Sequence, residues 1–392
     1  MTTQALKKWN KVKLGDVAEI ESGGTPSSTK SEYWDGGNIC WATLPDLKNK
    51  YIFDTQRKIT PLGLKNSSAK LLPINSVIFS SRATIGEVSI AKVEISTNQG
   101  SKNFICNPTK IDYEFLYYPL KSKVEEINSL ASGATYKEIN KTVFSSVEVE
   151  IPNIPTQKQI ADVLSTYDDL IENNSHRIQI LEQMAQVVYT EWFVKFRFPG
   201  HEKVKMIDSG TDFGKIPQGW IVKKLGEKID ISRGKNITKK TIDEGNIPVV
   251  AGGLEPAYFH NTPNTEAPVV TVSASGANAG FVNLYMENVW ASDCSYIDKK
   301  TTPFVLYYFL FLKSRQIEIT GLQRGSAQPH VYPKDLSGLL IVDAPDYLIG
   351  GFEKIVDVLF SLIGNLREQN KKLRAKRDLL LPKLVTGEIT VK

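Results

Sequence analysis

The chain contains two copies of one long sequence pattern, and this duplication constrains its fold more than any single motif. The segment WNKVKLGDVAEIESGGTPS, which begins at Trp9, has a counterpart WIVKKLGEKIDISRGKNIT that begins at Trp220. The stretch SRATIG at Ser81–Gly86 likewise matches SGANAG at Ser275–Gly280. A period of about two hundred residues is far longer than a solenoid repeat. The sequence therefore predicts a duplicated domain rather than a repeat array.

Each copy predicts an α+β domain of short strands with one moderate helix, followed by one long helix. Short apolar runs such as SVIFSS and VVTVSAS are separated by Gly, Pro, Asn and Ser, which is typical of strands and tight turns. A polar stretch with two prolines and no periodicity separates the copies and indicates a linker. We expect a first globular domain at 1–155, a helix at 156–198, a linker at 199–219, a second globular domain at 220–346, a second helix at 347–385 and a tail at 386–392.

Both long helices carry apolar residues alternately four and three positions apart, the spacing of a coiled-coil seam. The expected helix-pairing residues are Ile160, Leu164, Tyr167, Ile171, Asn174, Ile178 and Leu181 in the first helix, and Ile355, Leu359, Leu362, Leu366, Gln369 and Leu373 in the second. If a pseudo-twofold axis relates the copies, the helices pair as an antiparallel coiled coil, and Asn174 meets Gln369 near its middle. The alternative is two separate amphipathic helices, each lying on its own domain. Thr156 followed by Gln159 forms a capping-box pattern that predicts where the first helix begins.

The composition argues against several classes of protein. The 392 residues carry a net charge of +5, which permits local nucleic-acid contacts but does not require them. Cys40, Cys106 and Cys294 have no CxxC spacing and the four histidines are scattered, so we expect no disulfide framework and no metal site, and a reducing cytoplasm fits. No apolar segment is long enough to span a membrane. The chain also lacks an N/D-P-P-aromatic stretch and a GxxxxGK[S/T] loop, so we expect no catalytic residues and no cofactor in this chain.

The duplicated arrangement resembles the specificity subunits of type I restriction–modification enzymes. The resemblance is carried by KVKLGDVAEIESGGTPS, SSRATIG and STNQG in the first copy, by IPTQKQIADVLSTYDDLIENN at the start of the first long helix, and by the closing LLLPKLVTGEI. It implies that each globular domain is a target recognition domain, that the helices are a spacer, and that the chain binds a bipartite double-stranded DNA target without catalysing a reaction. The implied partners are two adenine-N6 methyltransferase subunits, which carry S-adenosylmethionine, and motor-nuclease restriction subunits, which use ATP and Mg²⁺. The resemblance implies no membrane partner.

Base reading requires polar side chains on loops, and phosphate binding requires Lys, Arg or backbone N–H groups. The candidate DNA-binding residues of the first copy are Thr25, Ser27, Lys30, Tyr33, Lys48, Lys50, Tyr51, Ser81, Arg82, Thr84, Tyr136 and Lys137. Those of the second copy are Arg233, Lys235, Asn236, Lys239, Lys240, Tyr258, His260, Ser275, Asn278, Arg324, Gln328 and His330. Any one of them can instead be a solvated surface residue. Arg82 and Arg324 are the strongest candidates, because each lies in or beside a Gly/Ser-rich stretch that recurs in both copies.

Two other functions stay open at the level of the sequence. One is the specificity subunit of a modification-only or phase-variable system, which needs the same domains without a nuclease partner. The other is a coiled-coil scaffold whose globular domains bind protein or carbohydrate. Adjacent methyltransferase and helicase-nuclease genes would favour the restriction–modification interpretation over this scaffold.

Overall fold

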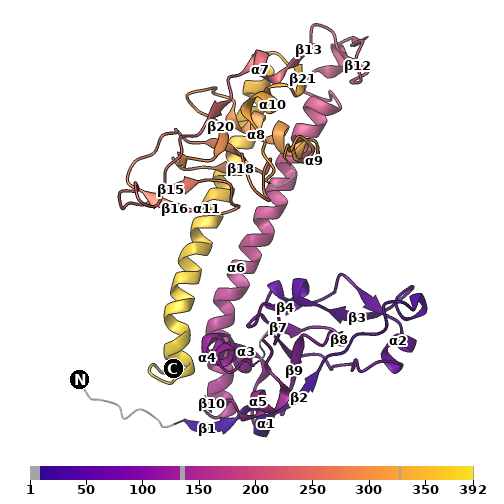
Figure 1. The fold of residues 1–392 in the computed structure, drawn as a ribbon, viewed down its shortest axis with the longest axis vertical. Coiled ribbons are helices and arrows are strands. Elements are labelled where there is room, and N and C mark those ends of the chain that lie inside the picture. Colours follow the sequence, from indigo (N-terminus) through magenta and orange to yellow (C-terminus); the bar gives the residue numbers. More distant parts are fainter. Residues whose placement is uncertain (1–8, 133–136, 326–327, 392) are drawn as a thin grey trace. The chain divides into compact units, whose positions relative to one another are not determined.

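The computed structural model describes residues 9–132, 137–325 and 328–391, which form two compact units (Figure 1). Unit 1 contains the residues up to Asn174 and those from Gln369 onward, and unit 2 contains Ser175–Glu368. Two long helices, α6 (Ile154–Tyr189) and α11 (Asp346–Val385), contribute a segment to each unit. Each unit therefore combines one domain of mixed helix and sheet with two helical segments, which confirms the predicted α+β class with two domains and two long helices.

The domain of unit 1 is built around the sheet β2-β9-β6-β7-β4, and a smaller sheet β5-β3-β8 accompanies it. Strands β6 and β7 are buried along their whole length, because α3 packs against both of them. Phe79 and Phe104 pack edge-on against Phe144 in the core. The strands are β1 (Asn10–Lys13), β2 (Ala18–Ser22), β3 (Ile39–Ala42), β4 (Tyr51–Ile52), β5 (Lys58–Ile59), β6 (Val77–Ser80), β7 (Val88–Ala91), β8 (Ile95–Thr97), β9 (Ser101–Cys106) and β10 (Glu148–Ile151). The helices are α1 (Leu14–Val17), η1 (Ser31–Tyr33), η2 (Leu44–Lys48), α2 (Pro61–Lys65), α3 (Tyr113–Ser122), α4 (Val124–Ser129) and α5 (Lys141–Ser146).

The domain of unit 2 repeats this plan with the sheets β14-β20-β17-β18 and β16-β15-β19. In each domain the smaller sheet contains a parallel pair, β3 with β8 and β15 with β19. The first strand of each domain also pairs antiparallel with its last, β1 with β10 and β13 with β21. The strands are β13 (Ile221–Lys224), β14 (Ser232–Arg233), β15 (Ile247–Val250), β16 (Tyr258–His260), β17 (Val269–Ser273), β18 (Val282–Tyr285), β19 (Trp290–Ala291), β20 (Cys294–Asp298) and β21 (Leu340–Asp343). The helices are α7 (Leu225–Lys228), α8 (Val305–Ser314), α9 (Gln316–Gly321) and α10 (Pro333–Ser337).

The stretch expected as a linker between the copies carries regular structure in unit 2. After α6, a π-helical turn η3 (Thr190–Val194) and a short helix η4 (His201–Lys203) lead to β11 (Met206–Asp208), which pairs antiparallel with β12 (Lys215–Pro217). Phe198 stacks on Trp220 with the ring centroids 5.2 Å apart. These aromatic contacts fix the stretch against the domain, although its polar composition shows no period.

The moderate helix expected in each copy is divided in two at an equivalent residue. The segments LKSKVEEINSL (120–130) and LKSRQIEITGL (312–322) align along their length. The break falls at Lys123 between α3 and α4, and at Arg315 between α8 and α9, with similar backbone angles (φ −99°, ψ 15° and φ −108°, ψ 21°). The shared break shows that the two domains are duplicates in structure as well as in sequence.

Each long helix is anchored to its domain by one polar residue at an equivalent position, the buried Gln157 in α6 and the half-buried Glu353 in α11. The Gln157 side chain accepts a hydrogen bond from the backbone N–H of Asp112, which caps α3, at 2.8 Å. The Glu353 carboxylate accepts two, at 2.9 Å each, from the N–H groups of Leu306 and Tyr307 in the first turn of α8. Burial raises the pKa of Glu353 to about 7. These bonds satisfy helix N–H groups that otherwise lack partners.

Within unit 1 the segments of α6 and α11 run antiparallel. The side-chain amide of Asn174 donates to that of Asn370 at 3.0 Å, and Asp168 pairs with Arg377 at 2.7 Å. A residue earlier in α6 therefore contacts a residue later in α11, as antiparallel helices require. Among the seam residues predicted for α6, Ile160, Leu164, Ile171 and Asn174 are buried and Tyr167 is half-buried.

Within unit 2 the helical segments also pair, but the seam of α11 differs from the prediction. Ile355 and Leu362, predicted to pair, are 43% and 45% exposed. The buried residues are Phe352, Val356, Phe360 and Ile363, with Leu359 half-buried and Leu366 buried, and on α6 Ile178 and Leu181 are half-buried. The seam is displaced because Phe352 packs against both Tyr189 and Phe193, at centroid distances of 6.1 and 5.0 Å. This aromatic cluster rotates α11 so that Ile355 and Leu362 face solvent.

Asn174 donates a hydrogen bond to Gln369, as predicted, and a shorter one to Asn370. Gln369 is exposed and its contact with Asn174 is 3.4 Å long, whereas Asn370 is buried and also donates to the carbonyl of Ile171 at 3.2 Å. Leu373, the last predicted seam residue of α11, is half-buried.

This difference gives a direct test of which amide fixes the register of the helices. We expect Asn370→Leu to lower the free energy of unfolding by about 1 to 3 kcal/mol, because Asn174 stays buried and loses its best partner. The matched variant Gln369→Leu is expected to change it by less than about 0.5 kcal/mol, the usual range for a surface substitution. Denaturant unfolding measures both, and a larger loss with Gln369→Leu would contradict the assignment.

Candidate nucleic-acid interface

The loop after the first sheet strand is held in the same way in both domains. In unit 1 the indole N–H of Trp41 donates to the carbonyl of Gly24 at 2.9 Å, and in unit 2 the indole N–H of Trp290 donates to the carbonyl of Lys235 at 2.8 Å. A Cβ on Gly23 would lie 1.9 Å from the carbonyl oxygen of Asn98, so only glycine permits this close approach. The candidate residues that follow, including Thr25 and Lys235, are thus presented on ordered backbone.

In unit 1 several polar side chains meet where β6 ends. Arg82 Nη2 lies 3.1 Å from one oxygen of Glu138, and Lys102 Nζ lies 3.2 Å from the other. The hydroxyl of Thr25 donates to the amide oxygen of Gln99. Arg82 and Gln99 line the same hollow of about 110 Å³. The structure therefore brings together Arg82 and Thr25, which are far apart in sequence, and adds three residues that the sequence analysis did not select.

In unit 2 the corresponding place holds a different set of side chains. Arg233 Nη2 pairs with Asp293 at 2.9 Å, and the Ser275 hydroxyl donates to the same carboxylate. The guanidinium of Arg233 lies 5.6 Å from the ring centroid of Tyr332, and His330 stacks on that ring with centroids 5.7 Å apart. This cluster combines a cation, a carboxylate and two stacked rings, which suits contact with both base edges and backbone.

The two clusters lie on the same backbone framework. Isolated bridges join Arg82 to Glu138 in unit 1 and Ser275 to His330 in unit 2. The residue after each of these bridge residues has a left-handed backbone, with φ +62° at Ala83 after Arg82 and φ +78° at Gly276 after Ser275. The two domains therefore share this backbone framework and differ in the side chains that it carries.

The structure places the predicted DNA-binding residues in three groups. The exposed ones are Thr25, Ser27, Lys30, Lys48, Thr84, Lys137, Arg233, Lys235, Asn236, Lys239, Lys240, Tyr258, Arg324 and Gln328. Those of intermediate exposure are Tyr51, Arg82, Ser275, Asn278 and His330, and the buried ones are Tyr33, Lys50, Ser81 and His260. Tyr136 lies outside the described residues. Arg324 is exposed but is held by Asp335 at 2.7 Å.

The four buried residues do not offer their side chains to a ligand in this structure. Lys50 pairs with Glu114 at 2.9 Å and its side chain is 4% exposed. His260 packs edge-on against Trp290 at 5.0 Å between ring centroids. Burial covers these four side chains in this structure, and their contact with DNA stays a prediction.

Residues that the sequence analysis missed include Gln99, Lys102, Glu138, Asp293 and Tyr332. Gln99 and Lys102 lie in STNQGSKNFI, which recurs in the second copy, and that recurrence is the signal that could have found them. Glu138 and Asp293 are acidic, so a search for cationic DNA contacts passes over them.

Unit 1 also contains a buried polar network between its domain and the long helices. The hydroxyl of Tyr118 donates to Asp168 at 2.9 Å, and the ammonium of Lys50 lies 3.1 Å from the same hydroxyl. Arg377 pairs with Asp168 at 2.7 Å. Burial and the adjacent Asp168 carboxylate hold the pKa of Tyr118 well above its usual range, so it remains a hydrogen-bond donor. In unit 2 the residue equivalent to Tyr118 in the aligned helix is Leu310, which is buried.

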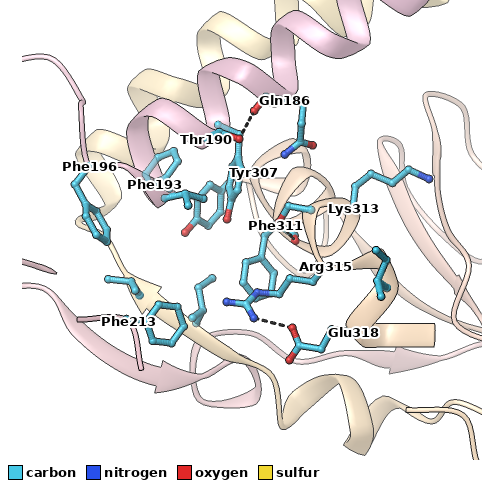
Figure 2. A pocket seen from close by; sticks show the side chains of 16 residues that line it. Gln186, Thr190, Phe193, Phe196, Phe213, Tyr307, Phe311, Lys313, Arg315 and Glu318 are labelled. Atoms are coloured by element: carbon cyan, nitrogen blue, oxygen red, sulfur yellow. Dashed lines mark hydrogen bonds and ion pairs between the residues drawn. The ribbon is translucent and has the colours of Figure 1, made fainter. Parts of the chain in front are cut away.

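A cavity of about 1060 Å³ in unit 2 lies between α6, α8 and the β11–β12 hairpin (Figure 2). Its wall is largely aromatic, with Phe193, Phe213 and Tyr307 facing it, and Arg315 pairs with Glu318 at 2.7 Å on one side. These groups form an apolar hollow with a satisfied ion pair. They do not form an arrangement of acid, base and nucleophile.

In the described part of the chain, none of the helices is both long and apolar enough to cross a membrane. Over the same residues, no group of three or more His, Cys, Asp or Glu side chains is placed to hold a metal ion.

The family model of the type I restriction modification DNA specificity domain matches residues 6–183 and 217–375, one match for each copy. The chain therefore belongs to this family of type I DNA specificity proteins. The specificity subunit of the type I restriction enzyme MjaIX from Methanocaldococcus jannaschii is 31% identical over 98% of this chain and 94% of its own length. The HindI specificity subunit of Haemophilus influenzae is 23% identical over 98% of this chain and all of its own length. The crystal structure of a type I S subunit from M. genitalium has the same fold, with a TM-score of 0.65, 19% identity and 98% coverage of both chains.

Proposed function

We propose that this chain is the sequence-reading subunit of a type I restriction–modification complex and binds a bipartite DNA target, one half-site per domain. The observation that carries the proposal is the pair of clusters around Arg82 and Asp293, which occupy one framework with different side chains. Two domains of this kind read two unlike short sequences. Exposed Lys30, Lys48, Lys239 and Lys240 supply the phosphate contacts that bind DNA of any sequence.

The long helices set the distance between the half-sites in this proposal. A helix of 36 residues, such as α6, is roughly 55 Å long at about 1.5 Å per residue. At about 3.4 Å per base pair, this length corresponds to roughly sixteen base pairs. A target of two short blocks separated by a fixed unread gap follows from that geometry.

The same proposal assigns partners to the exposed apolar side chains of the helices. Ile180, Met184, Val187 and Val194 are between 43% and 59% exposed and recur at helical spacing along α6 and η3. Exposed apolar residues that share a helix face are typical of a protein–protein contact. We assign this surface to the adenine-N6 methyltransferase subunits, which bring S-adenosylmethionine. Motor-nuclease subunits that use ATP and Mg²⁺ join the assembled complex, and this chain supplies DNA recognition without catalysis.

Methylation-aware sequencing of host DNA tests the proposal directly. We expect a split adenine-methylated motif in cells that carry the gene, and its complete loss when the gene is deleted. Restoring the gene on a plasmid should restore the same motif. A methylome that does not change on deletion would contradict the function. Loss of methylation without any accompanying loss of DNA cleavage activity would instead identify a modification-only system.

A further inference from the structure

We propose that Arg82 reads a guanine in the half-site bound by the first domain, and that Glu138 and Lys102 are positioning residues for its guanidinium. This inference rests on the proposed function, because it names a base that one recognition domain selects. It concerns described residues of unit 1 alone.

One contact holds the arginine, and two further contacts hold its partner Glu138 in place through Lys102. Each oxygen of Glu138 has its own cation, Arg82 at 3.1 Å and Lys102 at 3.2 Å. Lys102 is 4% exposed at its side chain and also donates to the hydroxyl of Ser81 at 3.2 Å, so it is a fixed point within the domain. The Arg82 side chain is 36% exposed. The guanidinium is therefore held in one orientation and still accessible to a ligand.

Arg82 lies beside polar groups at a small hollow. Its Nε is buried without a hydrogen-bond partner among the described residues, so the terminal Nη atoms are the donors left for a ligand. The side chain lines the small hollow together with Asn98 and Gln99, and Gln99 is oriented by the hydroxyl of Thr25. Guanine presents two adjacent acceptors, O6 and N7, in the major groove, and a planar guanidinium donates to both at once.

The ion pair favours a base over a phosphate as the ligand. Pairing with Glu138 partly neutralises the guanidinium and so weakens its attraction for a phosphate, while Lys102 leaves the cluster with a formal charge of +1. A guanine edge is uncharged and offers acceptors only on the side that meets the arginine. An arginine held by a carboxylate also loses little side-chain entropy on binding, because it is already ordered.

The second domain provides a matched control on the same framework. In the backbone bridge that is equivalent to Arg82–Glu138, the second domain has Ser275 in place of Arg82. The neighbouring cation, Arg233, forms an ion pair with Asp293 at 2.9 Å. A substitution at Ser275 is therefore expected to alter the second half-site and leave the first unchanged.

The experiment uses the full chain in complex with its methyltransferase subunits, and a panel of duplexes in which each base pair of the wild-type target is replaced in turn. Wild type should prefer guanine at one position of the first half-site by about 5- to 150-fold, the discrimination of one bidentate contact. Arg82→Gln should reduce that preference to less than about threefold, because glutamine pairs with adenine and not with guanine. Arg82→Lys should keep part of the preference, because an ammonium also donates to O6 and N7 but lacks the planar guanidinium fork. Glu138→Gln should weaken the same preference and no other, and Ser275→Ala should leave it intact.

Other results would overturn the inference. Equal weakening on every duplex, with a smaller salt dependence, would identify Arg82 as a phosphate contact. Full guanine discrimination in Arg82→Gln, or a changed preference in the second half-site, would also exclude it. Arg82→Lys keeps the charge beside Glu138, and circular dichroism of each variant reports whether the domain is folded. If wild type itself shows no split target, the proposed function fails, which is a different result from the failure of Arg82.

Discussion

Removal of seven residues from each long helix is expected to shorten the unread gap of the DNA target by about three base pairs and to leave both half-sites unchanged. Seven residues span about 10 Å of helix, which equals about three base pairs of duplex. Deletion of residues 177–183 from α6 and 362–368 from α11 removes one heptad from each, so the apolar seam continues in phase. Wild-type sites should then lose methylation, and sites with the shorter gap should gain it in methylation-aware sequencing.

Binding to the shorter target is also expected to be weaker than wild type. Three base pairs turn the duplex by about 100°, whereas one heptad turns an α-helix only about 20° from a full number of turns. The DNA must supply the remaining twist, which costs deformation energy. The control deletes the heptad from α6 alone, which leaves the seam of α11 unpaired over that length and should abolish methylation at every spacing. A double deletion that still methylates only the original spacing would show that the helices do not set the gap.

The duplicated domains and the long helices could be predicted from the sequence. The helix seam could not be placed in full, because it depends on contacts between residues that are far apart in the chain. The duplication follows from the repeat and the two long helices follow from apolar periodicity. Both patterns can be read from the sequence without knowledge of any spatial contact. The sequence leaves the seam of α11 undecided, because the adjacent residues Ile355 and Val356 are both apolar. The contact of Phe352 with Tyr189 of α6 determines that Val356 is buried and Ile355 is exposed. Likewise α6 begins at Ile154 instead of at the predicted capping box, since the Asn153 side chain accepts from the N–H of Thr156 at 3.0 Å.

The candidate site could also be predicted only in part from the sequence. Arg82 was found because its stretch recurs, and recurrence can be read directly from the chain. Lys50 lies in the polar segment LKNKY and resembles a surface residue, but its partner Glu114 is distant in sequence and draws it into the interior. Glu138 could not be selected from the sequence, because its role appears only when Arg82 and Lys102 are placed beside it.

Substitution of Asp168 by alanine is expected to lower the free energy of unfolding by about 3 to 5 kcal/mol, the usual cost of breaking a buried ion pair. The variant removes the Asp168 carboxylate, whose side chain is 9% exposed, from both Arg377 and the hydroxyl of Tyr118. Arg377 then keeps only its pair with Asp378, whose side chain is 60% exposed. The control is Glu182→Ala, which removes the pair with Arg367, where the side chains are 44% and 51% exposed. An exposed pair contributes about 0 to 1 kcal/mol. Denaturant unfolding compares them, and equal losses would contradict the assignment.

The network has a further consequence that separates stability from orientation. Apolar residues that fill a buried charged site often stabilise a protein as well as the charges did, and unit 2 has Leu310 where unit 1 has Tyr118. We therefore expect the triple variant Tyr118→Leu, Asp168→Leu, Arg377→Met to regain most of the stability lost in Asp168→Ala. Hydrogen bonds hold a domain against a helix in one geometry, and apolar contacts allow several. The triple variant should thus discriminate less sharply in the first half-site and normally in the second, whereas unchanged discrimination in both would limit the network to a role in stability.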